Sequence, residues 1–403
     1  KIPRWSKICI EVVMVVFFLH TVQVQGTEIG MWDYIQSVRE SSDFYEKEYV
    51  NPAKVKMTFP KEKKNLIYIF MESMESSYAD KEDGGTMDDN YIPNLTKLAR
   101  ENVQFTDKKD GKVGGPVCLE ATAYTAGGLV AQTSAINLKV MNSGAVSDSF
   151  LPNLTALGDI LNKQGYNQMF LCGSDGDFAG RDAYFKTHKD YQIEDYKAAI
   201  KEGDIPKDYK VYWGHEDKVL YERAKKNLKK LSKEGKPFNL TMLTVDTHFP
   251  NGYICDLCEN KYDTTYGNAV ACADRQVYDF VQWIKKQDFY EDTTIIIAGD
   301  HTSMVDTGSK FWKSLSNDYQ RTVYNAIINP QCAYKKKVTT KRKFSTMDMF
   351  PTTLAALGVE IDGNKLGLGT NLFSGEETLR EELGANYINK ELKRNDKMYN
   401  QFY

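Results

Sequence analysis

The stretch TTIIIAGDH, residues 293–301, decides the fold of this chain and contains the first candidate functional residues. Residues 294–298 are β-branched or apolar without alternation, which is typical of a strand buried on both faces of a parallel sheet. Gly299 ends the strand, and Asp300 and His301 follow it directly. In open α/β sheets, ligands bind beyond the carboxyl ends of the strands. The pair therefore predicts either a divalent metal site, for Mn²⁺ or Zn²⁺, or an ordinary solvated turn.

Other apolar strands alternate with helix-like segments along the chain. The predicted strands cover residues 65–71, 103–105, 167–172, 239–245, 293–298 and 322–328, and the predicted helices cover 92–101, 154–164, 217–234, 269–287 and 345–357. This alternation predicts an α/β fold with a doubly wound, mostly parallel sheet that is flanked by helices.

Basic residues precede an apolar run at the N-terminal end. The run ICIEVVMVVFFLHTVQV, residues 8–24, is at the short limit for a membrane span. A buried core helix is one alternative, and a signal peptide is another, although residues 22–25 lack a small-residue cleavage pattern. The basic residues predict a cytoplasmic N-terminus, the cell membrane as the location and an extracytoplasmic main domain. Because the chain does not begin with Met, we expect residues 1–26 to be a membrane anchor, the last transmembrane helix of a longer protein.

The remaining chain divides by composition into three parts. We expect a helical connector over residues 27–60, the main α/β domain over 61–375 and a charged helical tail over 376–403. The 403 residues are enough for one large domain. The net charge of −3 argues against a broad nucleic-acid-binding surface, so nucleic acid is not an expected partner.

Three of the seven cysteines are close together in the sequence. Cys255 and Cys258, in a C-x-x-C arrangement, and Cys272 could form a local disulfide or part of a zinc site. No fourth metal ligand lies at the right spacing, so the disulfide is the preferred interpretation. An extracytoplasmic location permits it.

A second carboxylate is predicted at the same sheet edge as Asp300 and His301. Glu72 follows the predicted strand 65–71 and would complete a metal site of two acids and one imidazole, with positions open for a substrate. Glu75 is an alternative ligand by position, and either glutamate could instead cap the next helix.

A hydroxyl suited to nucleophilic attack is predicted in the segment GGPVCLEATAYTAGGLVAQTSAINL, residues 114–138. Thr122 and Thr125 lie just ahead of residues 126–128, where a helix is predicted to start and where free N–H groups and the helix dipole favour a phosphate. A divalent metal lowers the pKa of a bound hydroxyl and so makes it a nucleophile at neutral pH. An ordinary threonine N-cap is the alternative.

Two more polar residues follow predicted strands. His248, in THFP after strand 239–245 and near Asp246, could bind a phosphoryl oxygen or protonate a leaving group. Arg181, in GSDGDFAGRD after strand 167–172, offers a bidentate guanidinium for a phosphate, whereas an exposed arginine would simply be solvated. Together these residue types suit phosphoryl or sulfuryl transfer.

The motifs, taken in order, resemble a known family. NLIYIFMESMESSY, the threonine-containing helix start, THFP and AGDH are similar to the phosphoglycerol transferases of the lipoteichoic acid synthase type. The closer resemblance is to the MdoB-like subgroup, within the alkaline phosphatase/sulfatase superfamily. It covers most of the chain from about residue 42 to the end, including IPNLTKLA, DMFPTTLAALG and LGLGTNLFSG.

The resemblance implies a bacterial enzyme whose sulfatase-like catalytic domain, 61–375, binds one divalent ion. In this family the ion is usually Mn²⁺, with Mg²⁺ or Zn²⁺ as alternatives. The matching metal ligands are Glu72, Thr125, Asp300 and His301. Thr125 also matches the nucleophile of the family, with Thr122 as the fallback.

The resemblance also implies a site for the phosphoglycerol group, held by His248 and Arg181. The family often has a tryptophan two residues before that arginine, where this chain has Ala179, so Phe178 or Tyr184 is expected to substitute for it. Sulfatases of the superfamily modify a Cys or Ser in a C/S-x-P-x-R context. The sequence around Cys118 lacks this pattern, which disfavours sulfatase activity.

The expected reaction is metal-dependent transfer of glycerol phosphate from phosphatidylglycerol to a cell-envelope acceptor, either a polyglycerolphosphate (lipoteichoic acid) polymer or a glycan. It would proceed through a covalent glycerophosphoryl-threonine intermediate and release diacylglycerol. A phosphoethanolamine transferase, or a sulfatase or phosphodiesterase of the same superfamily, is the chemically related alternative. A non-catalytic envelope-binding module is the alternative of a different class, and it predicts no bound metal.

Overall fold

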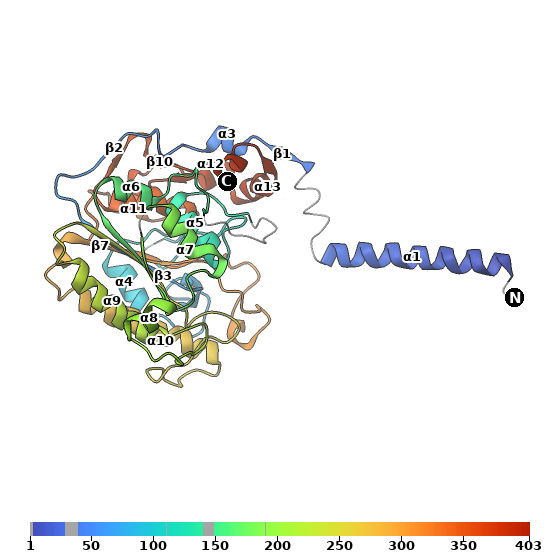
Figure 1. Ribbon diagram of the computed structural model, residues 1–403, viewed down its shortest axis with the longest axis horizontal. Coiled ribbons are helices and arrows are strands. Elements are labelled where there is room, and N and C mark those ends of the chain that lie inside the picture. The colour runs from blue at the N-terminus through green and yellow to red at the C-terminus, as the bar shows by residue number, and fades with distance from the viewer. Residues whose placement is uncertain (1–2, 29–38, 110, 140–148, 190) are drawn as a thin grey trace.

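A six-stranded sheet forms the centre of the main domain in the computed structural model, which describes residues 3–28, 39–109, 111–139, 149–189 and 191–403 (Figure 1). All neighbouring strands are parallel except the last pair, which is antiparallel. In order across the sheet, the strands are β5 (Gln192–Glu194), β4 (Asn167–Cys172), β6 (Phe238–Leu243), β3 (Asn65–Met71), β7 (Thr293–Gly299) and β8 (Asn325–Ile328). The predicted α/β fold with a mostly parallel sheet is confirmed.

Helices cover both faces of this sheet (Figure 1). Successive side chains of β3 alternate between two cores, because a strand has a period of two. Leu66, Tyr68 and Phe70 pack on one face and Ile67, Ile69 and Met71 on the other. The first core contains α5 (Thr125–Ser134), α6 (Leu157–Lys163), α7 (Arg181–Thr187) and α11 (Met349–Ala356), and the second contains α4 (Pro93–Glu101), α9 (Asp217–Leu231) and α10 (Thr265–Ile284).

Residues 103–105 do not form the predicted strand. Val103 makes a single antiparallel bridge to Ile327. Beyond it, the Asn325 side chain makes the hydrogen bonds that a neighbouring strand would make. Its Oδ1 accepts from the Phe105 N–H at 2.9 Å, and its Nδ2 donates to the Phe105 carbonyl at 2.9 Å. The backbone is therefore satisfied without a continuous strand. The predicted strand 322–328 is correspondingly shorter and begins at Asn325.

The connector and the tail are joined to each other in space. The described part of the connector contains α3 (Phe44–Glu48), whereas its residues 29–38 lie outside the described residues. Strand β1 (Ser41–Ser42) pairs in parallel with β12 (Asn395–Asp396) of the tail. The tail has two helices rather than one, α12 (Leu379–Leu383) and α13 (Ala385–Lys393), with Gly384 between them.

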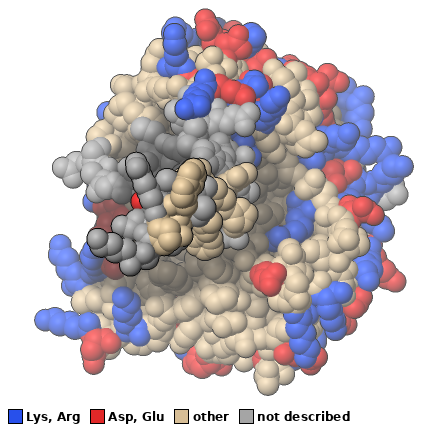
Figure 2. Space-filling model, turned by 90° about the vertical axis from the view of Figure 1, so that its right-hand side faces the viewer, with Lys and Arg blue, Asp and Glu red and all other residues tan. Residues whose placement is uncertain are grey.

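Smaller elements complete the domain. The connector strand β2 (Met57–Thr58) is antiparallel to β9 (Glu360–Ile361), and β10 (Lys365–Leu366) is antiparallel to β11 (Gly369–Thr370). Helix α8 (Tyr196–Glu202) follows β5. Basic and acidic side chains are interspersed around the rim of the face in Figure 2, as expected for a chain with a net charge of −3.

The N-terminal apolar run forms helix α1 (Arg4–Glu28). Within the described ranges, no helix combines the length and the apolar character that a membrane span requires. The membrane anchor expected over residues 1–26 stays a prediction. Glu11, His20 and Gln23 interrupt the run, and polar groups at such positions are costly in a bilayer.

The cysteine cluster contains a disulfide between Cys258 and Cys272, so the preference for a local disulfide is confirmed. The Cys255 sulfur lies 3.6 Å from that of Cys258 without being bonded to it. The bridge connects the loop after β6 to α10.

Candidate active site

Three candidate metal ligands meet where β3 and β7 end side by side. The register pairs Met71 with Gly299, so Glu72 and Asp300 leave neighbouring strands at the same level. The ligand atoms of Glu72, Asp300 and His301 all lie within 4.8 Å of one another, and all three side chains are buried. His301 Nε2 is 3.3 Å from Glu72 Oε1 and 3.5 Å from Asp300 Oδ2.

Backbone hydrogen bonds fix Asp300 in this cluster. Its Oδ1 accepts from the N–H groups of Ser73 at 2.8 Å and His301 at 2.7 Å. Ser73 has a φ of 51°, a left-handed conformation that is uncommon outside glycine. This conformation directs its N–H to Asp300, while its hydroxyl donates to Glu72 Oε1 at 2.7 Å. The second oxygen of Asp300, Oδ2, is buried and has no hydrogen-bond partner among the described residues.

The ring of His301 is oriented by its other nitrogen. Nδ1 lies 2.9 Å from the Thr302 carbonyl, and because a carbonyl only accepts, Nδ1 donates. Nε2 is therefore the nitrogen that faces the two carboxylates. A second nitrogen held in this way is the usual arrangement for a histidine that binds a metal.

The electrostatics show that the two carboxylates of the cluster share one positive charge, that of His301. Burial and the nearby Glu72 carboxylate raise the pKa of Asp300 to about 8. Burial opposes the charged form of His301, but Asp300 and Glu72 outweigh it and raise its pKa to about 10. Burial likewise opposes the charged form of Glu72, yet His301 holds its pKa well below the usual range. A divalent cation bound between the two carboxylates would balance the negative charge that a single imidazolium leaves over.

The residues fit a divalent metal by their chemistry. Asp300 Oδ2 is a buried oxygen that accepts no hydrogen bond from the described residues, and a buried group of this kind is costly unless something binds it. Two carboxylates and an imidazole nitrogen suit Mn²⁺ and Zn²⁺. The position of Oδ2 beside Glu72 and His301 therefore supports the predicted metal site.

Thr125 reaches the cluster because α5 packs closely on the end of β7. A Cβ placed on Gly128 would lie 2.2 Å from the Asp300 carbonyl oxygen, so only glycine permits this approach. Gln132, one turn further, donates to the Gly299 carbonyl at 2.9 Å. Thr125 is the first residue of α5, and its hydroxyl lies 3.2 Å from Glu72 Oε2 and 3.4 Å from His301 Nε2.

A cavity of about 370 Å³ opens beside this cluster and is lined by Glu72, Thr125, Arg181 and His248, among others. Arg181 is buried and held by its surroundings. Its Nε donates to the Phe178 carbonyl at 3.0 Å, and its Nη2 donates to Ser174 Oγ at 3.0 Å and to the Asp175 carbonyl at 2.7 Å. Among the described residues, Nη1 has no acceptor, which leaves it for an anion in the cavity. All six predicted site residues are thus brought together at or beside one cavity.

Two aromatic residues of the cavity were not predicted from the sequence. Trp213 packs against the His248 ring with centroids 5.0 Å apart, and the Tyr212 hydroxyl donates to the His248 carbonyl at 2.6 Å. His248 Nδ1 is 2.7 Å from the Phe249 carbonyl, to which it donates, so Nε2 is the nitrogen free to exchange a proton. The pair Tyr212 and Trp213 follows no strand and shows no periodic pattern, so only the fold reveals its position.

The structure also separates the alternatives left open by the sequence. Glu75 is paired with Arg321 and accepts from the Ser303 N–H at 2.8 Å, so it does not belong to the metal cluster. The hydroxyl of Thr122 is buried and donates to the Leu119 carbonyl at 2.9 Å. Of the two aromatic substitutes for tryptophan, Phe178 lines the cavity.

Tyr184, the other alternative, does not line this cavity. Its hydroxyl lies behind α5, 2.7 Å from that of Thr133 and 2.5 Å from that of Ser134. Asp246 is likewise turned away from the cavity and accepts from the Asp217 N–H at 3.2 Å. It stands behind the loop that carries His248 rather than beside the ring.

Comparisons with known proteins agree with this geometry. Phosphoglycerol transferase I of Salmonella choleraesuis (strain SC-B67) is 33% identical over 340 residues, which cover 81% of this chain. The match covers 41% of that relative, so the chain spans less than half of its length. The lipoteichoic acid synthase LtaP from Listeria monocytogenes has a similar structure, with a TM-score of 0.61 at 19% identity over 79% of each chain.

A third comparison concerns the C-terminal periplasmic domain of EcEptC from Escherichia coli in complex with Zn. It aligns with a TM-score of 0.54 at 14% identity, over 78% of this chain and 88% of that one. At these identities the two solved structures establish the fold. The model of the sulfatase family matches residues 64–359, which include β3, β7 and every candidate site residue. The chain therefore belongs to the sulfatase family.

Proposed function

We propose that this protein transfers glycerol phosphate from phosphatidylglycerol to a cell-envelope acceptor, a polyglycerolphosphate chain or a glycan, with release of diacylglycerol. The observation that carries the proposal is the position of the Thr125 hydroxyl, 3.2 Å from Glu72 Oε2 and 3.4 Å from His301 Nε2, at the wall of the cavity. A nucleophile beside a metal-binding cluster and a buried arginine is the arrangement that phosphoryl transfer requires. The name of the 33% identical relative supports phosphoglycerol as the group transferred.

Glu72, Asp300, His301 and Thr125 would hold one divalent ion, for which we propose Mn²⁺, with Mg²⁺ or Zn²⁺ as alternatives. When bound, the ion would lower the pKa of the threonine hydroxyl and stabilise negative charge on the phosphoryl oxygens. The remaining steps belong to side chains of this protein. Arg181 Nη1 binds and orients a phosphoryl oxygen, as a guanidinium held by three other hydrogen bonds can do.

The first step forms a bond between Thr125 Oγ1 and phosphorus and breaks the bond to the diacylglycerol oxygen. Glu72 Oε2 is the acceptor nearest to the proton that the hydroxyl loses. His248 Nε2 supplies a proton to the departing diacylglycerol oxygen. In the second step an acceptor hydroxyl gives its proton to His248 and bonds to phosphorus. The bond from phosphorus to Thr125 Oγ1 breaks, and this oxygen takes back the proton held by Glu72. Covalent catalysis divides the transfer into two displacements.

The proposed location is the outer side of the cell membrane, where a phospholipid donor and an envelope acceptor can both reach the cavity. The Cys258–Cys272 disulfide supports this placement, because disulfides persist outside the reducing cytoplasm. We further propose residues 61–375 as the catalytic unit, with residues 27–60 and 376–403 packed together beside it.

The test is incubation with phosphatidylglycerol that carries a labelled glycerol headgroup, with and without Mn²⁺. Wild-type protein should release diacylglycerol and carry the label on the peptide that contains Thr125. Thr125→Ala should lower the rate roughly 10³-fold or more, as loss of a nucleophile does in other enzymes. Thr122→Val is the matched control, because it removes the neighbouring hydroxyl outside the cavity and should keep the label at Thr125.

Two results would contradict the proposal. One is undiminished turnover in a folded Thr125→Ala variant. The other is faster release of diacylglycerol from phosphatidylethanolamine than from phosphatidylglycerol in a side-by-side assay, which would indicate a phosphoethanolamine transferase. Purified protein without bound metal and without metal-stimulated turnover would favour a non-catalytic binding module.

A further inference from the structure

A second cavity, of about 610 Å³, lies at the edge of the sheet away from the strand ends that carry Glu72 and Asp300. Strand β8 is antiparallel to β7 and pairs Asn325 with Ala298 and Ile328 with Ile295. The end of β8 that leads to the cavity therefore lies beside the amino end of β7. Ile327 and Pro330 line the cavity there, together with residues 99–104 at the end of α4 and just after it. None of the proposed catalytic residues lines it.

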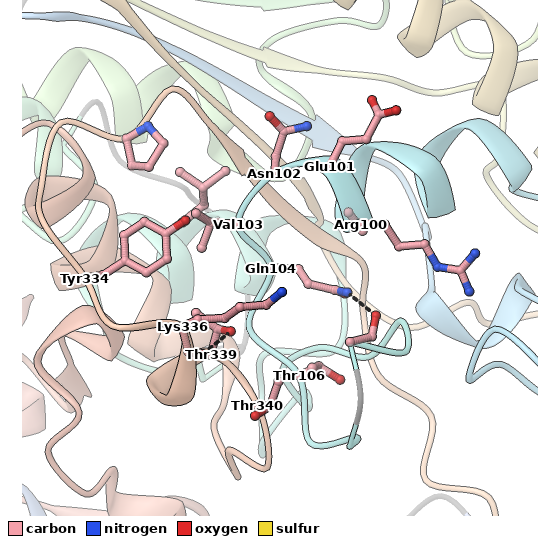
Figure 3. A pocket seen from close by; sticks show the side chains of 14 residues that line it. Arg100, Glu101, Asn102, Val103, Gln104, Thr106, Tyr334, Lys336, Thr339 and Thr340 are labelled. Carbon is pink, nitrogen blue, oxygen red and sulfur yellow. Dashed lines mark hydrogen bonds between the residues drawn. The ribbon is translucent and has the colours of Figure 1, made fainter.

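The opposite wall comes from residues 334–340, which include the short helix η5 (Lys336–Thr339). Figure 3 shows Lys336 extending toward Gln104, with the Tyr334 ring to one side of them. The hydroxyl residues Thr106 and Thr340 lie along the same wall region. The lining is thus mostly polar, with one aromatic ring.

Gln104 shows that the cavity has an unfilled hydrogen-bonding position. The residue is only 7% exposed, and its Nε2 donates to the Gly111 carbonyl at 2.9 Å. Its Oε1 is buried and accepts no hydrogen bond from the described residues. A buried acceptor without a donor costs free energy, so a hydroxyl group bound in the cavity would remove a standing penalty.

Lys336 gives the cavity a positive charge and makes no ion pair with any described carboxylate, while Glu101, the one acidic residue of the lining, lies 4.0 Å from Lys97. Arg100, the other cation of the lining, is already paired with Asp83. Further lysines lie close in the sequence to the residues that line the cavity. They are exposed and make no ion pair with any described residue, and they are Lys109, Lys112, Lys335, Lys337, Lys341 and Lys343. An anion would therefore be attracted to this face and would find Lys336 as its direct partner.

Tyr334 supplies an apolar surface for the carbon backbone of a ligand. Its ring is 42% exposed and is supported from behind by Phe373, with centroids 5.5 Å apart. Ring, free ammonium and unfilled amide oxygen together match a ligand that has CH groups, a phosphate and hydroxyls. Small-ligand sites combine apolar surface with a few convergent polar groups, and Tyr334, Lys336 and Gln104 supply such a combination here.

We propose that this cavity is a second, non-catalytic binding site for a phosphodiester-linked polyol or sugar chain. Lys336 binds a phosphate of the chain, Gln104 Oε1 accepts from one of its hydroxyls and Tyr334 contacts its carbon backbone. The identification of this chain as the transfer acceptor rests on the function proposed above, whereas the binding does not. A chain held here stays bound to the protein between reactions, because a second attachment raises its effective concentration at the transfer centre.

The experiment is calorimetric titration of the full chain with a synthetic oligomer of glycerol phosphate, in an Arg181→Ala background that weakens binding in the catalytic cavity. Lys336→Glu should weaken oligomer binding by at least about tenfold, the effect of losing one charge-assisted contact. Lys337→Glu is the matched control, because it makes the same charge change one residue away, outside the lining, and should change binding less than threefold. Gln104→Leu should also weaken binding, with its folding checked by thermal unfolding.

Other outcomes would overturn the proposal. Equal weakening by Lys336→Glu and Lys337→Glu would show a diffuse surface charge rather than a cavity, as would tighter binding to phosphatidylglycerol vesicles than to the oligomer. Inorganic phosphate that binds as tightly as the oligomer would show an anion site only. Cleavage of phosphatidylglycerol by the Lys336→Glu protein with Arg181 intact is a separate readout and should be unchanged. Binding that persists while phosphatidylglycerol is not cleaved would refute the proposed function and leave the site in place.

Discussion

At the residue scale, Asp300 is where the fold and the proposed chemistry meet. One of its oxygens accepts from two backbone N–H groups, and the other is buried and accepts no hydrogen bond in the part of the chain that the structure describes. The first oxygen fixes the side chain and the second is left to bind a ligand. Ser73 makes this possible, because its left-handed backbone directs one of those N–H groups to the carboxylate. The backbone therefore holds the Asp300 carboxylate in one position.

The affinity of the site for Mn²⁺ should rise with pH. In the metal-free protein the pKa of Asp300 is raised to about 8 and that of His301 to about 10, so both hold protons at pH 6. A metal must displace these protons, and each one released contributes up to about tenfold in affinity per pH unit. Calorimetric titrations at pH 6, 7 and 8, in two buffers of different ionisation enthalpy, measure both the affinity and the protons released. A dissociation constant for Mn²⁺ that does not change over this range would contradict the assignment of these ligands.

Glu75 shows how the second layer of the site is held. It is fully buried, and its carboxylate accepts from Arg321 Nε at 3.0 Å and from the Ser303 N–H at 2.8 Å. Arg321 also donates to the Ser303 carbonyl at 2.7 Å. These bonds tie the loop after His301 to the end of β3. The glutamate next to the site is therefore structural, while Glu72 is the candidate ligand.

Arg321→Ala should lower the free energy of unfolding by about 3–5 kcal/mol, because it leaves the buried Glu75 charge without a partner. Urea unfolding measures this loss. The double variant Glu75→Gln/Arg321→Ala is the control, since it removes the charge as well and should recover part of the stability. A single variant as stable as the wild type would show that this ion pair does not hold the loop.

At the scale of elements, the sequence pattern predicted the strands whose positions depend on nearby residues. The bounds of β3 and β4 match the prediction, because both strands are apolar runs that begin at an asparagine. The predicted strand at Val103 was wrong, since the Asn325 side chain replaces the ladder from a distant part of the chain. Trp213 was missed for a related reason: its contact with His248 joins two loops that only the fold brings together.

The loop between β6 and α10 depends on its disulfide. Cys258 and Cys272 are 14 residues apart, and closing a loop of about 15 residues contributes about 3 kcal/mol. The double variant Cys258→Ser/Cys272→Ser should lose roughly that much, measured by chemical denaturation, and both residues must be changed because Cys255 lies 3.6 Å from Cys258. Cys332→Ser, a change at an unpaired cysteine, is the control. Equal unfolding midpoints with and without a reducing agent would refute this role for the bridge.

At the scale of the whole molecule, the two ends of the described domain are clamped together beside α5. Tyr45 of the connector packs on Tyr399 and Phe402 of the tail, and its N–H donates to Asp396 at 3.0 Å. Tyr45 also donates to Asn137 Oδ1 at 2.6 Å, just after the helix that begins with Thr125. The sequence predicted a connector and a tail as separate parts, because no local pattern records a pairing over about 350 residues.

Deletion of residues 395–403 should therefore destabilise the catalytic domain rather than trim a free end. Tyr399 and Phe402 are buried, and each contributes about 1.5–3 kcal/mol on burial, so the loss should be roughly 3–6 kcal/mol. The Lys139 N–H, which donates to the Tyr399 hydroxyl at 2.9 Å, would lose its partner as well. Thermal unfolding of the truncated and full chains measures the effect, and deletion of Tyr403 alone, which is partly exposed, should change stability by less than about 0.5 kcal/mol. Because the clamp supports the segment after α5, turnover in the truncated protein should fail at a lower temperature than in the full chain. A truncated protein with an unchanged melting temperature would mean that the catalytic domain is complete without its tail.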